Sequence, residues 1–221
     1  ELGVVLAGTG VGKSMVLVHL GAEAMKQGLS VVHYTLELQD TVVAGRYDSC
    51  LTGHALDDVF EMKDDIFAEI QEIEGKLLIK EYPTKTASTQ TITAHLDKLV
   101  RHGHKIDVVL VDYGDLLRPT KSHSEKRIEL ESIYEQLRAI AQQFKCALWT
   151  ASQVNRQNLY AEVITMEAIS EAFSKCFVSD FIFSLSRTVD DKNCNEGRIF
   201  IAKNRNGPDG IVLPVFMDTK Y

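Results

Sequence analysis

The sequence predicts an α/β domain in which helices cover both faces of a mostly parallel, twisted sheet, with an antiparallel hairpin at its C-terminal edge. Two observations lead to this prediction. Short apolar runs typical of strands alternate with segments of helical periodicity, which is the pattern of a parallel sheet. The last two runs are separated only by residues 203–210, too few for a crossover helix, so they pair as a hairpin.

The individual elements follow from apolar spacing and from stop signals. The expected strands cover residues 2–7, 31–36, 77–79, 107–111, 147–151, 181–185, 198–202 and 211–216. The expected helices cover residues 13–27, 41–51, 88–102 and 124–144. Gly28 is placed to end the first helix and Asp40 to cap the second. No internal boundary is visible, so residues 1–221 form one expected domain, and the strand near residue 1 suggests that upstream elements of a longer protein are missing.

Composition narrows the class of protein. The 221 residues are 45% hydrophobic and 25% charged, which fits one globular domain. No apolar run approaches the roughly 20 residues that span a bilayer. The four cysteines form no CxxC pair, which argues against zinc and disulfides and indicates a reducing, cytosolic chain. A net charge of -7 lacks the basic excess usual for nucleic-acid binding, but cations confined to a few loops would suffice, so charge does not decide.

A P-loop is the strongest local signal. The segment Ala7-Gly-Thr-Gly-Val-Gly-Lys-Ser14 follows a strand and precedes a helix, with Ala7 where the strict pattern has glycine. Backbone N–H groups of such a loop surround phosphates at the positive end of a helix. The residues expected to hold ATP are Gly8, Thr9, Gly10, Val11, Gly12, Lys13 and Ser14, with Lys13 on the terminal phosphates and Ser14 on Mg²⁺. The alternative is an ordinary glycine-rich turn.

Two carboxylates follow other strands of the expected sheet. Asp112 ends the apolar run from residue 107 and is the expected second protein group on the Mg²⁺ side. Glu37 ends the second strand and should face the same crevice, where it would activate the attacking water. The alternative for Glu37 is a helix cap, although Asp40 suits that role better. Asp115 is expected to be a solvated charge or a cap.

Polar residues at two further strand ends are candidates for phosphate contacts. Gln153 follows an apolar strand and is suited to sense the terminal phosphate, although polar strand ends are common. Lys203 and Arg205 are two positions apart before a Gly/Pro turn, so both cations face the same way and can approach one anion. The alternative is a hairpin tip that only aids solubility.

Taken in order, these motifs resemble the DnaB-type replicative helicases, a RecA-like group of ATPases, over nearly the entire chain. The similarity rests on the P-loop and on Thr35-Leu-Glu37, Val111-Asp-Tyr113, Ser152-Gln-Val-Asn-Arg156 and Lys203-Asn-Arg-Asn-Gly-Pro208. Residues 80–87 look closer to the phage (T-even type) branch. The resemblance implies an ATP-driven DNA helicase motor of the 5′–3′ type, active as a homo-hexameric ring on single-stranded DNA in bacterial or phage-infected cytoplasm. Primase and a helicase loader are possible partners, and no membrane is involved.

The resemblance also implies residue roles. Glu37 is the catalytic base, Gln153 couples the phosphate state to DNA contact, and Lys203 and Arg205 are a finger pair that enters the ATP site of the neighbouring subunit. Two departures are visible: Gly114-Asp-Leu116 replaces the bacterial Leu-Gln-Leu, and residues 170–175 lack the arginine of a DNA-contacting loop.

The DNA contacts and the overall activity keep alternatives. The first expected channel loop contains Arg118, Lys121, Lys126 and Arg127, and the second runs from residue 155 towards residue 175. The alternative for the first loop is a solvated charge cluster at a helix start. The alternative activities are another RecA-like ATPase, such as a strand-exchange recombinase or a KaiC-like regulator, and a nucleotide-gated clamp that barely hydrolyses. The single Glu37 and the basic hairpin favour the helicase.

Overall fold

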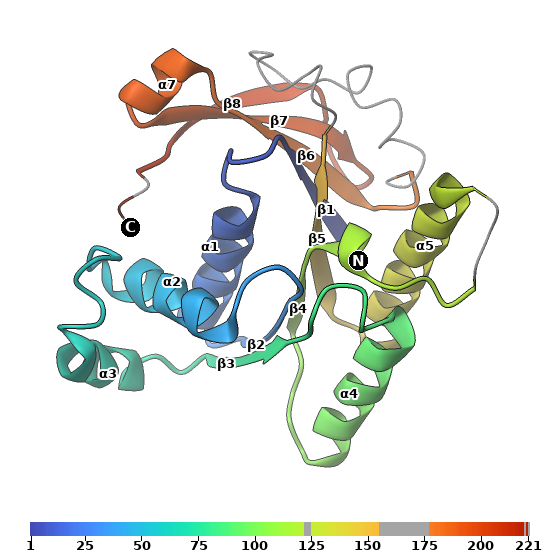
Figure 1. Ribbon diagram of the computed structural model, residues 1–221, viewed down its shortest axis with the longest axis horizontal. Helices are drawn as coiled ribbons and strands as arrows, with labels where there is room; N and C mark the ends of the chain where they lie inside the picture. The colour runs from blue at the N-terminus through green and yellow to red at the C-terminus, as the bar shows by residue number, and fades with distance from the viewer. Residues whose placement is uncertain (122–124, 155–176, 219, 221) are drawn as a thin grey trace.

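A computed structural model describes residues 1–121, 125–154, 177–218 and 220, and these residues form one sheet of eight strands flanked by helices (Figure 1). The strand order is β3-β2-β4-β5-β1-β6-β7-β8. Every neighbouring pair from β3 to β6 is parallel, whereas β6–β7 and β7–β8 are antiparallel. The mostly parallel sheet and its C-terminal antiparallel hairpin are therefore confirmed.

All eight expected strands are present. Their bounds are β1 Leu2–Ala7, β2 Ser30–Thr35, β3 Lys76–Glu81, β4 Val108–Asp112, β5 Ala147–Gln153, β6 Phe181–Ser186, β7 Glu196–Asn204 and β8 Ile211–Phe216. The longer helices are α1 Lys13–Lys26, α2 Asp40–Thr52, α4 Thr89–Arg101 and α5 Lys126–Phe144. The shorter ones are α3 Lys63–Gln71, the 3₁₀ turn η1 Gly114–Leu116 and α7 Val189–Asn193.

The two faces of the sheet carry separate parts of the core. Along β1, Leu2, Val4 and Leu6 belong to the cluster that includes α4 and α5, while Val5 packs with Leu17 of α1 on the other face. Alternate residues of a strand point to opposite faces, so this continuous apolar run is buried on both sides. Figure 1 shows the same division, with α1 and α2 on one side of the strands and α4 and α5 on the other.

Helix ends agree with the sequence in one case and differ in another. Gly28 adopts φ 77° just after α1 and donates its N–H to the Met25 carbonyl at 2.8 Å, which confirms the stop. Gln39, not Asp40, is the residue that precedes α2, and it makes no side-chain capping bond. The expected Asp40 cap is thus wrong, because Asp40 is already the first helical residue and its Oδ1 accepts from the adjacent Thr41 N–H, at 2.7 Å.

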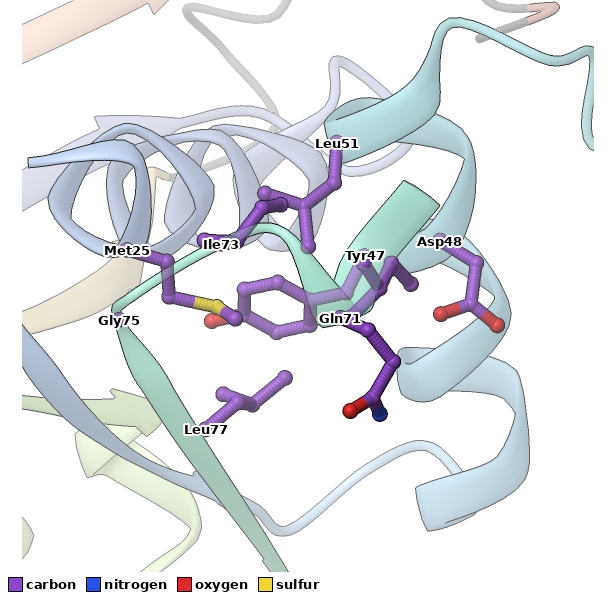
Figure 2. A pocket seen from close by; sticks show the side chains of 9 residues that line it. Met25, Tyr47, Asp48, Leu51, Gln71, Ile73, Gly75 and Leu77 are labelled. Carbon is purple, nitrogen blue, oxygen red and sulfur yellow. The ribbon is translucent and has the colours of Figure 1, made fainter. Parts of the chain in front are cut away.

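A hollow of about 270 Å³ lies where α1, α2, α3 and β3 meet (Figure 2). It is lined by Met25, Tyr47, Asp48, Leu51, Ile70, Gln71, Ile73, Gly75 and Leu77. Figure 2 shows the Tyr47 ring in the middle of this group. Burial raises the pKa of the Asp48 carboxyl at its margin. No residue expected to hold nucleotide lines this hollow.

Among the helices in the described ranges, none is both long and apolar enough to cross a membrane.

Candidate nucleotide-binding site

The carboxyl ends of β2, β4, β5 and β1 lie side by side in the sheet, and the P-loop follows the last of them. Ala7 of β1 is in register with Gln153 of β5, and Thr35 of β2 with Asp112 of β4. Ligands of open parallel sheets bind outside these strand ends. Four separate sequence signals therefore converge on one edge of the sheet.

The P-loop has the backbone conformation that its glycines allow. Gly10 and Gly12 adopt φ values of 71° and 117°, which side chains with a Cβ rarely tolerate. Gly12 immediately precedes α1, so the loop ends at the positive pole of that helix. The Lys13 ammonium donates to the Gly8 carbonyl at 3.2 Å, and buried Val11 anchors the loop beside β6. A glycine-rich loop with one lysine at the N-terminus of a helix suits a polyphosphate.

Asp112 and the neighbouring charges fit a magnesium site. Its side chain is buried, at 1% exposed, and neither carboxylate oxygen has a hydrogen bond of ordinary geometry to a described residue. Burial raises the pKa of Asp112, and the negative charge of Glu37 raises it further. The pKa is lowered by the Ser14 hydroxyl and by the positive charges of Arg46 and Lys13. A buried carboxylate whose oxygens are so poorly bonded needs a cation or ordered water, and Mg²⁺ with its water shell supplies both.

Glu37 is carried by a firmly bonded segment. The N–H of Leu36 donates to the Asp112 carbonyl at 2.9 Å, and the Thr84 hydroxyl donates to the Leu36 carbonyl at 2.7 Å. The Glu37 side chain is exposed, and its charge raises the pKa of Lys13, whereas burial, the larger effect, lowers it. Since Gln39 precedes α2, Glu37 is not the cap of that helix. Its role as base stays a prediction.

Gln153 lies against the P-loop. Its Nε2 donates to the hydroxyl of Thr9, and the N–H of Val154 donates to the Ala7 carbonyl at 3.2 Å. These bonds place Gln153 beside the loop expected to hold phosphate, and its role as a phosphate sensor stays a prediction. Asn155 and Arg156, which follow in the motif, lie outside the described residues.

A polar network beneath the site was not expected from the sequence. Asp115 is not a simple solvated charge or cap: its carboxylate accepts from the Tyr134 hydroxyl at 2.9 Å and the Ser152 hydroxyl at 3.3 Å. The buried Thr150 hydroxyl donates to the Val111 carbonyl at 2.8 Å and accepts from the Gly114 N–H at 2.9 Å. These bonds join the ends of β4 and β5. The sequence signal for them is slight, since it consists of polar residues at alternate positions in a buried strand.

Arg46 is a second residue that motif reasoning missed. It lies on α2, and its positive charge lowers the pKa of Asp112, so it contributes to the field at the site. No motif marks it in the sequence.

Lys203 and Arg205 lie at the opposite end of the sheet. The Arg205 N–H donates to the Asp180 carbonyl at 2.9 Å, and the Asp180 N–H donates to the Leu2 carbonyl at 2.9 Å, so Arg205 lies near the start of β1. The P-loop follows the end of that strand at Ala7, about 16 Å away at roughly 3.3 Å per residue. The Lys203 ammonium donates to the Phe177 carbonyl at 2.6 Å. These cations are thus remote from the phosphate-binding loop of their own chain.

The cations expected in the first channel loop are at the surface. Arg118, Lys121, Lys126 and Arg127 are all exposed, and Arg127 pairs with Glu131 at 3.1 Å. The second expected loop, residues 155–175, lies outside the described residues.

The chain is similar to a known family and to known proteins. The family described as "DnaB-like helicase C terminal domain" matches residues 1–221. A DnaB-like replicative helicase of Enterobacteria phage T4 is 28% identical over 222 residues, covering 93% of this chain and 46% of the relative. The replicative DNA helicase DnaB of Mycoplasma genitalium is 25% identical over 233 residues, covering 96% of this chain and 49% of the relative. The chain therefore spans about half the length of these relatives.

Solved structures share the fold. A solved ATPase domain superposes with a TM-score of 0.83 at 18% identity, covering 100% of this chain and 82% of that one. A DnaB-like replicative helicase, described with its interactions with primase, superposes with a TM-score of 0.84 at 18% identity, covering 100% of this chain and 57% of that one.

Proposed function

Because the chain belongs to the DnaB-like helicase C-terminal domain family, we propose that it is the ATP-driven motor of a ring-forming replicative DNA helicase of the 5′–3′ type. Its place of action would be the cytoplasm of a bacterium or of a phage-infected cell. One observation carries the proposal. The groups suited to ATP hydrolysis gather at the carboxyl ends of the parallel strands, while Lys203 and Arg205 lie at the opposite end of the sheet. A subunit built in this way can complete its site only with a neighbour.

The nucleotide roles follow from the arrangement at the strand ends. The P-loop N–H groups and Lys13 hold the phosphates of ATP. Ser14 and the buried Asp112 carboxylate hold Mg²⁺, which neutralises phosphate charge when bound. Glu37 orients and deprotonates the attacking water from its exposed position beside Lys13. Gln153, bonded to Thr9 of the loop, reports loss of the terminal phosphate to the segment after β5.

The remaining roles involve other molecules. Lys203 and Arg205 form the finger pair, which enters the neighbouring subunit's ATP site within a homo-hexamer. Single-stranded DNA contacts the exposed cations after β4, Arg118 and Lys121 among them, through phosphates, so the motor steps along any sequence. A relative of the same fold is described with primase, which supports primase as a partner; a helicase loader is a second candidate.

The test uses mixed rings of the longer protein. Glu37→Gln should bind ATP without turnover, and Arg205→Ala should bind ATP with turnover reduced by about 10³-fold or more, as for other trans-acting arginines. Arg101→Ala, which removes an exposed cation from α4, is the matched control and should behave as the wild type.

Co-assembly of the two inactive variants should restore part of the activity, because some interfaces then combine an intact Glu37 with an intact Arg205. Normal hydrolysis by an assembled Arg205→Ala ring would refute the proposal. ATP-dependent displacement of a strand from a forked duplex separates a motor from a regulator or clamp.

A further inference from the structure

Asp180 lies just before β6, at the end of the sheet opposite the P-loop, and its carboxylate is the centre of a charged cluster. The side chain is only 7% exposed. Oδ2 accepts from the Leu2 N–H at 3.0 Å and from Arg138 Nε at 3.3 Å, while Oδ1 accepts from Arg138 Nη2 at 2.9 Å. Arg205 Nη1 lies 3.1 Å from the same Oδ1. One buried carboxylate thus contacts two arginines and the backbone of a central strand.

Two of these partners, Arg138 and the backbone of Leu2, fix the position of the Asp180 carboxylate. Arg138 on α5 binds Asp180 in the two-point geometry typical of arginine and carboxylate, and Leu2 begins the central strand β1. Burial alone would raise the pKa of Asp180, but the hydrogen bonds from Arg138 and Leu2 lower it, so the group stays charged. The carboxylate is therefore held in place by Arg138 and the Leu2 N–H, which are separate from its contact with Arg205.

Arg205 contacts Asp180 through its backbone and through one side of its guanidinium, and its side chain is half exposed. Its N–H donates to the Asp180 carbonyl at 2.9 Å, which fixes the backbone, and its side chain is 48% exposed. A guanidinium has five N–H donors, and the contact with Asp180 uses one edge of it. Among the described residues, Asp180 alone forms an ion pair with this guanidinium, so the other edge can meet a second anion that approaches from outside the subunit.

We propose that Asp180 is a positioning residue for Arg205: it holds one edge of the guanidinium so that the opposite edge meets the phosphates of the nucleotide bound by the adjacent subunit. This inference rests on the proposed function, in which Arg205 acts between subunits. The physical gain is preorganisation, since an arginine already held in one orientation loses less side-chain freedom when the phosphate is bound in the transition state.

The experiment is a double-mutant cycle in the assembled longer protein, with single-stranded DNA and saturating ATP. Asp180→Asn preserves the shape and removes the charge. We expect it to lower kcat by about tenfold, the lower end of the effect of losing an orienting partner at metal sites, and to leave nucleotide affinity unchanged. In the Arg205→Ala background the same substitution should change kcat no further, because the residue it positions is absent.

Arg138→Gln is the matched control for stability. It removes the other guanidinium from the same carboxylate, so it should lower Tm as Asp180→Asn does while keeping most of the turnover. If Asp180→Asn does not assemble, Asp180→Glu enters the same cycle, since it keeps the charge but moves it by one methylene.

The outcomes separate the two proposals. Normal turnover by Arg205→Ala refutes the function proposed for that residue. Impaired Arg205→Ala together with wild-type kcat in Asp180→Asn overturns only the positioning role. An equal loss from Asp180→Asn in both backgrounds shows that Asp180 acts through general structure, and a gain in turnover shows that it restrains Arg205; either result overturns the inference.

Discussion

Replacement of Thr150 by valine tests the bonds that hold the end of β4. The Thr150 hydroxyl is fully buried, donates to the Val111 carbonyl at 2.8 Å and accepts from the Gly114 N–H at 2.9 Å. Valine has the same shape but can make neither bond. An unpaired buried polar group costs about 1–3 kcal/mol, so two of them predict a loss of roughly 2–6 kcal/mol in the free energy of unfolding.

The measurement is urea unfolding at equilibrium, in which Thr150→Val should lower the midpoint without changing the slope m. Thr93→Val is the matched control. The Thr93 hydroxyl donates to the Thr89 carbonyl at 2.9 Å within α4, so its loss leaves the helix bonds in place and should change stability by less than about 0.5 kcal/mol. Equal midpoints for the two variants would refute the reasoning. Because Asp112 lies between Val111 and Gly114, Thr150→Val should also reduce ATP turnover.

Three further predictions concern buried positions. Asp112→Asn should abolish Mg²⁺-dependent hydrolysis and should raise the urea midpoint of the nucleotide-free domain. Burial raises the pKa of Asp112, so the charged carboxylate lowers stability at pH values above its unfolded pKa of about 3.9, and the stability gain of the variant should vanish below that pH. Burial lowers the pKa of His33 to about 3, so stability should be lost as pH falls below its unfolded pKa of about 6.5. At about 1.4 kcal/mol per pH unit, the loss at pH 5 is about 2 kcal/mol. If His33→Phe keeps the wild-type dependence of unfolding free energy on pH, this prediction is contradicted. Gly3→Ala places a Cβ in steric overlap with the Trp149 ring and should lower stability by about 1–3 kcal/mol in thermal melts, whereas Gly45→Ala, in a helix with open space around the new methyl, should be neutral or stabilising.

The parts of the site that could be predicted from the sequence are those whose residues directly follow a strand. The P-loop, Asp112 and Gln153 each follow an apolar run, and parallel strands bring such ends to one edge, so linear spacing is enough to bring them together. The expected strands were found for the same reason, because apolar runs buried on both faces are visible without any partner. Glu37 was expected to face this crevice, and its charge does act on Lys13.

What the sequence concealed depends on contacts between distant segments. Asp115 looked like a surface charge because its partner Tyr134 lies on α5, 19 residues away. Helix α3 was missed because it buries only Ile66 and has no side-chain cap, which leaves little periodicity to detect. The Asp180–Arg205 pair joins the start of β6 to the end of β7, and only the antiparallel pairing of those strands brings the two residues together.

The distance between Arg205 and the P-loop of its own chain limits the symmetry of any assembly that uses both. If the finger pair of one subunit enters the phosphate site of the next, the two contacting surfaces are different, so the interface is heterologous and a two-fold dimer cannot form through it. An open row of such subunits always leaves one unfinished site at one end and one idle arginine at the other. Only closure into a ring gives every subunit a complete site, so the number of active sites becomes a test of closure. Turnover measured in rings that contain increasing fractions of Arg205→Ala subunits would then follow the number of intact interfaces and not the number of intact chains.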